Sequence, residues 1–176
     1  MAANIPPPAD DKDDIYAVMQ KLFDDSRAVK SAHFIASQRK NRHAKIIGAI
    51  VIVLNVLIGS GLIEAVIKDD SGITTTIKAL SFLAAALAGI QTFFNFQKEV
   101  ECHTNAGHVY SSINHRLGLL MAEYQEQPAN RPALINDFKT LNTEYLKAND
   151  EGRGCVPTDN DYKKARAGIE ARKSVR

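Results

Sequence analysis

Motifs for catalysis are what this sequence most clearly lacks. It has no glycine-rich phosphate-binding loop, no nucleophile elbow, and no pair of carboxylates in an apolar context. Such patterns supply phosphate cradles, nucleophiles and acid–base pairs in many enzymes. We therefore expect a protein that is not an enzyme and has no catalytic residues.

Strand patterns are missing too. No segment alternates apolar and polar residues with the period of two that a half-buried strand requires. Apolar residues instead recur every three or four positions, which is the spacing of one helix face. The sequence therefore predicts an all-α protein.

Charge is nearly absent from two long apolar runs, residues 46–67 and 73–96. The first run would extend about 33 Å as a helix, against a hydrocarbon core of about 30 Å. Backbone in lipid must satisfy its own hydrogen bonds, so both runs are predicted to be transmembrane helices. The five residues 68–72 between them predict an antiparallel two-helix hairpin. Neither run carries a row of charges, so an ion pathway built on acidic rings is not indicated.

Acidic residues are absent between Arg27 and Lys45, where six Lys or Arg occur. Positive charge beside a span favours the cytoplasmic side, which places both termini in the cytoplasm. Cys102 and Cys155 are the only two cysteines, and the cytoplasm would keep them as reduced thiols without a disulfide.

Histidines raise the question of a metal site near Cys102. His103, His108 and His115 follow one another at steps of five and seven residues, whereas two helical ligands favour a step of four. We interpret them as scattered helical histidines and predict no metal site and no resident cofactor.

Small residues mark possible contacts between helices of the membrane segment. Such residues allow close helix approach, and they exceed what one hairpin needs for its own packing. We therefore predict a homo-oligomer in membrane lipid. Asn55 lies near the middle of its span, where its amide either forms a hydrogen bond between helices or lines a pore. The candidate pore and oligomer residues are Asn55, Gly59, Ser81, Ala85 and Gly89.

The remaining segments predict a cytoplasmic helical bundle. Residues 1–13 form a loose tail, residues 14–45 an amphipathic helix, and residues 97–176 a helical stalk and bundle around the 46–96 hairpin. The basic end of the chain is interpreted as a solvated helix end, with anionic lipid or a nucleotide as the alternative and no nucleic-acid partner. The predicted apolar face of the stalk consists of Val100, Val109, Tyr110, Ile113, Leu117, Leu120, Met121 and Tyr124.

A longer motif follows the second span. The span runs into a Gln-Thr-Phe-Phe step, and a cytoplasmic helix with a His, a small-residue-plus-Gly step and a Tyr comes next. A His43-containing basic stretch and a Val156-Pro157 segment with Tyr162 and Ala165 accompany this motif. With these features the chain resembles the SLATT family of two-transmembrane effector domains. The motif residues that serve as the candidate cytoplasmic mouth and gate are Gln91, Thr92, Phe93, Phe94, Asn95, Phe96, His103, Gly107 and Tyr110.

The resemblance implies an effector of bacterial nucleotide-signalling defence against phage. Such an effector would assemble in the inner membrane and permeabilise it when a cyclic or other nucleotide signal arrives. The signal would be bound by the cytoplasmic helices or by a separate nucleotide-synthesising or nucleotide-sensing partner. The region from Gln91 to Gly107 would couple span and bundle as one helix.

Two other functions remain open on the sequence. A non-catalytic membrane anchor or scaffold for a soluble signalling partner needs only one packed hairpin. An unregulated holin-like toxin would kill without any nucleotide. Oligomeric state separates the anchor from the pore, and ligand dependence separates the toxin from the regulated effector.

Overall fold

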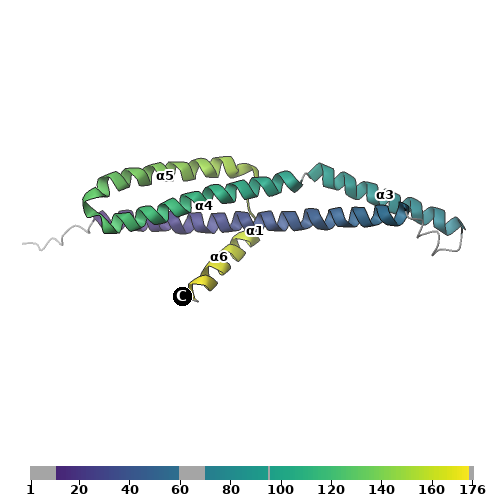
Figure 1. Cartoon of the computed structure of the whole chain (residues 1–176), viewed down its shortest axis with the longest axis horizontal. Helices are drawn as coiled ribbons and strands as arrows, with labels where there is room; N and C mark the ends of the chain where they lie inside the picture. Colours follow the sequence, from purple (N-terminus) through teal and green to yellow (C-terminus); the bar gives the residue numbers. More distant parts are fainter. Residues whose placement is uncertain (1–10, 60–69, 95, 175–176) are drawn as a thin grey trace, which may run out of the picture. The chain divides into compact units, whose positions relative to one another are not determined.

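The structure, a computed structural model, describes residues 11–59, 70–94 and 96–174. All secondary structure in these ranges is helical, so the all-α prediction is confirmed. The elements are α1 (Asp11–Gly59), α3 (Asp70–Phe94), α4 (Phe96–Glu126), η1 (Pro128–Asn130), α5 (Arg131–Glu151), η2 (Gly152–Gly154) and α6 (Asp159–Lys173) (Figure 1).

Some helix ends follow the positions of proline and glycine. α1 is 49 residues long, and neither residue type occurs in it before Gly48. α4 ends at Glu126, two residues before Pro128, because the residue preceding a proline is disfavoured in the α conformation. Pro132 is accepted in the first turn of α5, where a backbone N–H has no helical acceptor anyway. Proline therefore accounts for the end of α4 and the start of α5, whereas α3 ends at Phe94 and α4 begins at Phe96 with no proline or glycine between them.

The chain divides into two compact units. One comprises Met1–Ile35 and Cys102–Arg176, here the bundle unit, and the other comprises Ala36–Glu101, here the apolar unit. Both α1 and α4 contribute residues to each unit. The predicted membrane span 46–67 is described as far as Gly59, and the predicted connection 68–72 lies partly outside the described residues.

The bundle unit is built on antiparallel neighbours. Tyr16 stacks near Tyr124, with ring centroids 6.4 Å apart, while His33 lies beside His103. Residue numbers therefore increase along α1 in the direction in which they decrease along α4, so these two helices are antiparallel. Tyr110 of α4 likewise contacts Tyr145 of α5, so α5 returns along α4. The three helices run along one another in Figure 1, and α6 runs at an angle to them.

Buried positions on α4 repeat every seven residues. His103, Tyr110, Leu117 and Tyr124 form one such series. This spacing keeps one face of a helix against its neighbours, as in coiled coils. The cluster that forms the core consists of Met19, Leu22, Tyr110, Ile113, Leu117, Leu120, Met121, Tyr124, Leu134, Leu141 and Ala148.

A capping box begins α6. The Thr158 hydroxyl accepts a hydrogen bond from the Asp161 backbone N–H, and Asp161 Oδ2 accepts one from the Thr158 backbone N–H at 2.9 Å. The two side chains thereby satisfy donors that a helix start leaves without partners. Asp161 is fully buried, so this cap is also part of the packing of the bundle unit.

The apolar unit exposes large apolar side chains. Within its described part, α1 contains one helical segment that is long and apolar enough to cross a membrane, by length and composition. Only 6% of its 18-residue apolar window is buried. A shorter apolar stretch covers Thr75–Ile90 of α3. Small residues such as Ala44 and Ala84 are buried in this unit, whereas large side chains such as Ile52, Val56 and Phe82 are exposed.

Candidate functional site

Two buried histidines meet between α1 and α4. His33 Nδ1 lies 3.2 Å from His103 Nδ1, and each side chain is 3% exposed. The Tyr110 ring stacks on His33 at 5.5 Å. Burial, with His103 as a second cause, lowers the pKa of His33 to about 4. His33 is therefore a neutral imidazole near pH 7, and neutral imidazole is the form that donates a lone pair to a metal.

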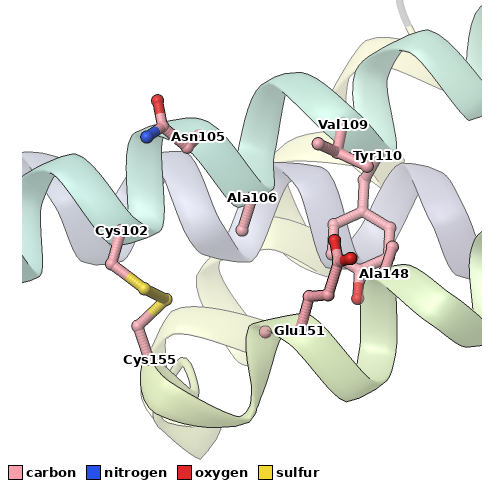
Figure 2. Close-up of a pocket in the computed structure, with 9 residues that line it drawn as sticks. Cys102, Asn105, Ala106, Val109, Tyr110, Ala148, Glu151 and Cys155 are labelled. Carbon is pink, nitrogen blue, oxygen red and sulfur yellow. A yellow bond between two sulfur atoms is a disulfide. The ribbon is translucent and has the colours of Figure 1, made fainter.

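A disulfide lies next to this pair. Cys102 of α4 is bonded to Cys155, which follows η2, and their Cα atoms are 6.1 Å apart (Figure 2). The expectation of two reduced thiols is therefore wrong for this structure. That expectation used only the compartment, whereas the antiparallel return of α5 along α4 brings the two cysteines together. The bond closes a loop over a sequence separation of 53 residues.

Cys155 and the two histidines form a single cluster of donor atoms. One nitrogen from His33, one from His103 and the sulfur of Cys155 all lie within 4.8 Å of one another, and all three residues are buried. Histidine spacings within α4 alone could not indicate this cluster. Its members come from α1, α4 and the segment between α5 and α6. A signal was present in His33, because this polar residue stands at helical spacing from Val29 and Ala36 in the predicted amphipathic helix 14–45.

A pocket of about 210 Å³ borders the disulfide. Cys102, Ala106 and Val109 of α4 line one side, and Ala148 and Glu151 of α5 lie across from them (Figure 2). The pocket is smaller than the roughly 300–1,000 Å³ of most small-molecule sites. Both cysteines are among its lining residues, and the pocket is too small for a dinucleotide.

Tyr110 lies between the histidines and this pocket. Its hydroxyl donates a hydrogen bond of 2.6 Å to Asn149 Oδ1, and its ring packs edge-on against Tyr145. Burial, followed by the proximity of Tyr145 and Tyr162, raises the pKa of Tyr110 to about 12. Tyr110 is therefore a neutral donor at physiological pH, and its place beside His33 is structural.

Asn114 is the centre of a buried polar network that the sequence analysis did not single out. Its side-chain NH₂ donates to the Phe23 carbonyl at 2.8 Å and to Ser26 Oγ at 2.9 Å. Its Oδ1 accepts from Lys30 Nζ at 2.8 Å. Burial, with Arg27 as the next cause, lowers the pKa of Lys30. The network fixes α4 against α1 near the middle of their shared length in the bundle unit.

Gly107 is buried where α1 approaches α4 closely. A Cβ atom at this position would lie 2.9 Å from Phe34 Cε1 and 3.0 Å from Phe34 Cζ. The Phe34 ring in turn packs edge-on against His108, with centroids 5.4 Å apart. Gly107 therefore provides the space for an aromatic ring of the neighbouring helix.

The candidate pore residues lie in the apolar unit. Asn55 on α1 is exposed, as are Ser81, Ala85 and Gly89 on α3. A Cβ added at Gly89 would meet nothing within 4 Å. Gly59 is the last residue of α1. The small-residue face of α3 is thus uncovered in the single chain.

The candidate gate residues are divided between the units. Gln91, Thr92, Phe93 and Phe94 form the last turn of α3, and their side chains lie outside the described residues, as does Asn95 entirely. Phe96 begins α4 and is half-buried. His103, Gly107 and Tyr110 are buried together in the bundle unit. The prediction of one helix through Asn95 falls on a residue that the structure does not describe.

Comparison with known proteins bears on the resemblance to the SLATT family. No family model, curated protein or solved structure matches this chain. The resemblance therefore rests on the motif residues themselves.

Proposed function

We propose that this chain is an integral membrane effector that oligomerises and permeabilises a bacterial inner membrane. The observation that carries the proposal is the exposed apolar window of α1, of which 6% is buried. A core helix of a water-soluble protein has its apolar face covered by neighbours. In water this surface would be costly at about 25 cal/mol per Å² of apolar area, whereas in lipid it costs nothing. Lipid is therefore the environment that this helix fits.

α3 supports a second span. Phe82 is 78% exposed, and Leu83 and Ile90 are also exposed. In an antiparallel hairpin of α1 and α3, these side chains of α3 would face lipid, as would the exposed apolar side chains of α1. The six basic residues between Arg27 and Lys45 would hold the bundle unit on the cytoplasmic side.

Assembly is supported by what α3 leaves uncovered. Ser81, Ala85 and Gly89 share one face, since they are spaced by four residues, and all three are exposed. Small residues permit close helix approach in lipid, where packing rather than water exclusion drives association. A second copy of the chain would bring such a face within contact distance, and Asn55 would add a hydrogen bond between helices or a polar group in the pore.

Control of the pore is the part of the proposal that rests on the SLATT resemblance. Membership in that family would make this chain the effector of a nucleotide-signalled defence that stops growth of infected cells. The pocket beside the disulfide is too small for a dinucleotide. A nucleotide signal would therefore be bound elsewhere on the cytoplasmic helices or by a separate partner that acts on the bundle unit.

Reconstitution in dye-loaded liposomes tests the proposal. We expect leakage from the wild type in the presence of the activating nucleotide or partner, and growth arrest when the chain is overexpressed with its signal. The probes are a panel of cyclic and linear nucleotides. Silence in liposomes together with normal growth would overturn the pore. Leakage without any ligand would contradict regulation by a nucleotide and would favour an unregulated holin-like toxin.

Gly89→Leu tests the assembly step. The larger side chain should abolish oligomers in detergent and leakage together, because it fills the face needed for close approach. Ala79→Leu is the matched control, since it adds the same side chain to another face of α3 at 3.6 residues per turn. A wild type that is strictly monomeric would favour the membrane anchor, and unchanged assembly of Gly89→Leu would show that another face is used.

A further inference from the structure

Three residues with metal-binding side chains, His33, His103 and Cys155, converge in the bundle unit, and a fourth, Cys102, is bonded to one of them. His33 Nδ1 and His103 Nδ1 face each other at 3.2 Å, and the Cys155 sulfur belongs to the same cluster within 4.8 Å. Cys102 is bonded to that sulfur. We propose that His33, His103, Cys155 and Cys102 form a zinc site when the disulfide is reduced. This site goes beyond the proposed pore function and does not depend on it.

The distances fit tetrahedral coordination. Two Zn–N bonds of about 2.0–2.1 Å at a tetrahedral angle hold the nitrogens about 3.3 Å apart. The observed separation of 3.2 Å therefore needs almost no movement of either ring. A Zn–S bond of about 2.3 Å would place sulfur about 3.6 Å from each nitrogen. One donor atom from each of His33, His103 and Cys155 lies within 4.8 Å of the other two, so Cys155 has at most about 1 Å to close. Cys102 would complete the set once its bond to Cys155 is broken.

The donor types select zinc. Two thiolates and two imidazoles make the Cys₂His₂ set of closed structural zinc sites, and borderline-soft Zn²⁺ suits both sulfur and nitrogen. His33, His103 and Cys155 are 3%, 3% and 6% exposed, so water is largely kept from the position of the ion. Burial of the ligands and their origin on three separate segments of the chain are both typical of a structural role. The ion would join α1, α4 and the connection between α5 and α6.

Reduction and metal binding balance as two consecutive steps. A dithiol reductant supplies two electrons and two protons, which break the Cys102–Cys155 bond and leave two thiols, while the reductant becomes its own disulfide. Zn²⁺ then binds both sulfurs as thiolates, and two protons are released to solvent. The disulfide and the zinc site are thus two alternative crosslinks made by the same cysteines. In a reducing cytoplasm, where disulfides are rare, the zinc form is the expected state.

Cobalt substitution tests the site directly. Tag-free full-length protein in detergent is reduced with a phosphine, which reduces the disulfide and binds metal weakly, and is then titrated with Co²⁺. We expect one equivalent to bind with visible ligand-field bands of tetrahedral cobalt and thiolate-to-cobalt charge transfer. Zn²⁺ should displace the cobalt. The oxidised protein should show neither signal, since its sulfurs are bonded to each other.

Single substitutions identify the ligands. Cys155→Ser, His33→Asn and His103→Gln should each weaken cobalt binding by about 100-fold or more, as expected for loss of one of four ligands. Cys102→Ser should also remove about half of the charge-transfer intensity. His108→Gln is the matched control, because His108 is an exposed histidine on the same helix as His103.

The wild type alone can overturn the inference, whether or not a variant folds. Reduced wild type that takes up no Co²⁺, or oxidised wild type that gives the same spectrum, contradicts it. Equal loss of binding in His108→Gln and His103→Gln contradicts the ligand assignment. Liposome leakage is a separate measurement, so a failed zinc site and a failed pore would be told apart.

Discussion

Three helical glycines of the bundle unit offer a graded test of its packing. A Cβ added at Gly168 of α6 meets nothing within 4 Å, and one added at Gly118 of α4 meets Phe23 Cε2 at 3.3 Å. At Gly107 the same atom would lie 2.9–3.1 Å from three ring atoms of Phe34. Glycine to alanine is one chemical change at all three positions, so differences among the variants report the surroundings.

The expected sizes follow from two opposing effects. Alanine stabilises a helix interior by about 0.5–1 kcal/mol relative to glycine, which is the full gain expected for Gly168→Ala. At Gly118 a single ring carbon must move by a few tenths of an ångström, so the gain is largely offset. At Gly107 the Phe34 ring, which also packs edge-on against His108, must shift, and overpacking of this kind costs about 1–3 kcal/mol. Gly107→Ala should therefore be less stable than Gly168→Ala by about 1–3 kcal/mol.

Tyrosine fluorescence measures this unit alone. The chain has five tyrosines and no tryptophan, and Tyr16, Tyr110, Tyr124, Tyr145 and Tyr162 all lie in the bundle unit. Urea unfolding of the full chain in detergent, followed by this signal, gives the free energy of unfolding of each variant.

A second substitution shows whether the Phe34 ring is the cause. In a Phe34→Leu background the ring is gone, so Gly107→Ala should become stabilising, and the coupling between the two sites should be about 1–3 kcal/mol. Equal gains for all three glycine variants, or no coupling to Phe34, would refute the close approach of α1 and α4 at Gly107.

Three more predictions concern the same unit. Asn114→Ala should lower the free energy of unfolding by about 2–4 kcal/mol, because it removes three buried hydrogen bonds and leaves a cavity, whereas exposed Asn105→Ala should change it by less than about 0.5 kcal/mol in the same urea assay. Thr158→Ala should cost about 0.5–2 kcal/mol and speed amide exchange at the start of α6, while exchange in α4 stays unchanged. The raised pKa of Tyr110 means that the unfolded chain loses this proton first, so stability should fall as pH rises from about 10 to about 12, and Tyr110→Phe should reduce that fall in unfolding followed by circular dichroism.

Much of the fold could be predicted from the sequence, because the buried face of a helix is marked by apolar residues three and four positions apart. On α4 the spacing of three and four correctly predicted that Tyr110, Ile113, Leu117, Leu120, Met121 and Tyr124 would be buried. Val109 was predicted on the same face and is exposed, because it lies one residue, or about 100°, from the centre of the stripe formed by its buried neighbours. Pro128 and Pro132 correctly predicted the break between α4 and α5, and Gly152, Gly154 and Pro157 predicted the segment after α5.

The candidate site depended on information that local patterns do not hold. Ser26, His33 and Asn114 are polar, so a count of apolar periodicity places them outside the core, yet each is buried with a partner on another helix. Their pairing is decided by the alignment of α1 with α4. The cysteine pair was missed for the same reason, since only the return of α5 along α4 brings Cys155 to Cys102.

The seven-residue repeat of α4 has a consequence for how the bundle folds. A helix with such a repeat could slide by one period, about 10.5 Å, and still present an apolar face to its neighbour. The Ser26–Asn114 pair makes that slip costly, because Asn114 would then face Met19 or His33 instead of the serine hydroxyl. An amide left without partners in the core costs about 1–3 kcal/mol, and a displaced His33–His103 pair adds to it. The buried polar residues thus distinguish the native alignment from neighbouring ones that apolar contacts alone would rank almost equally.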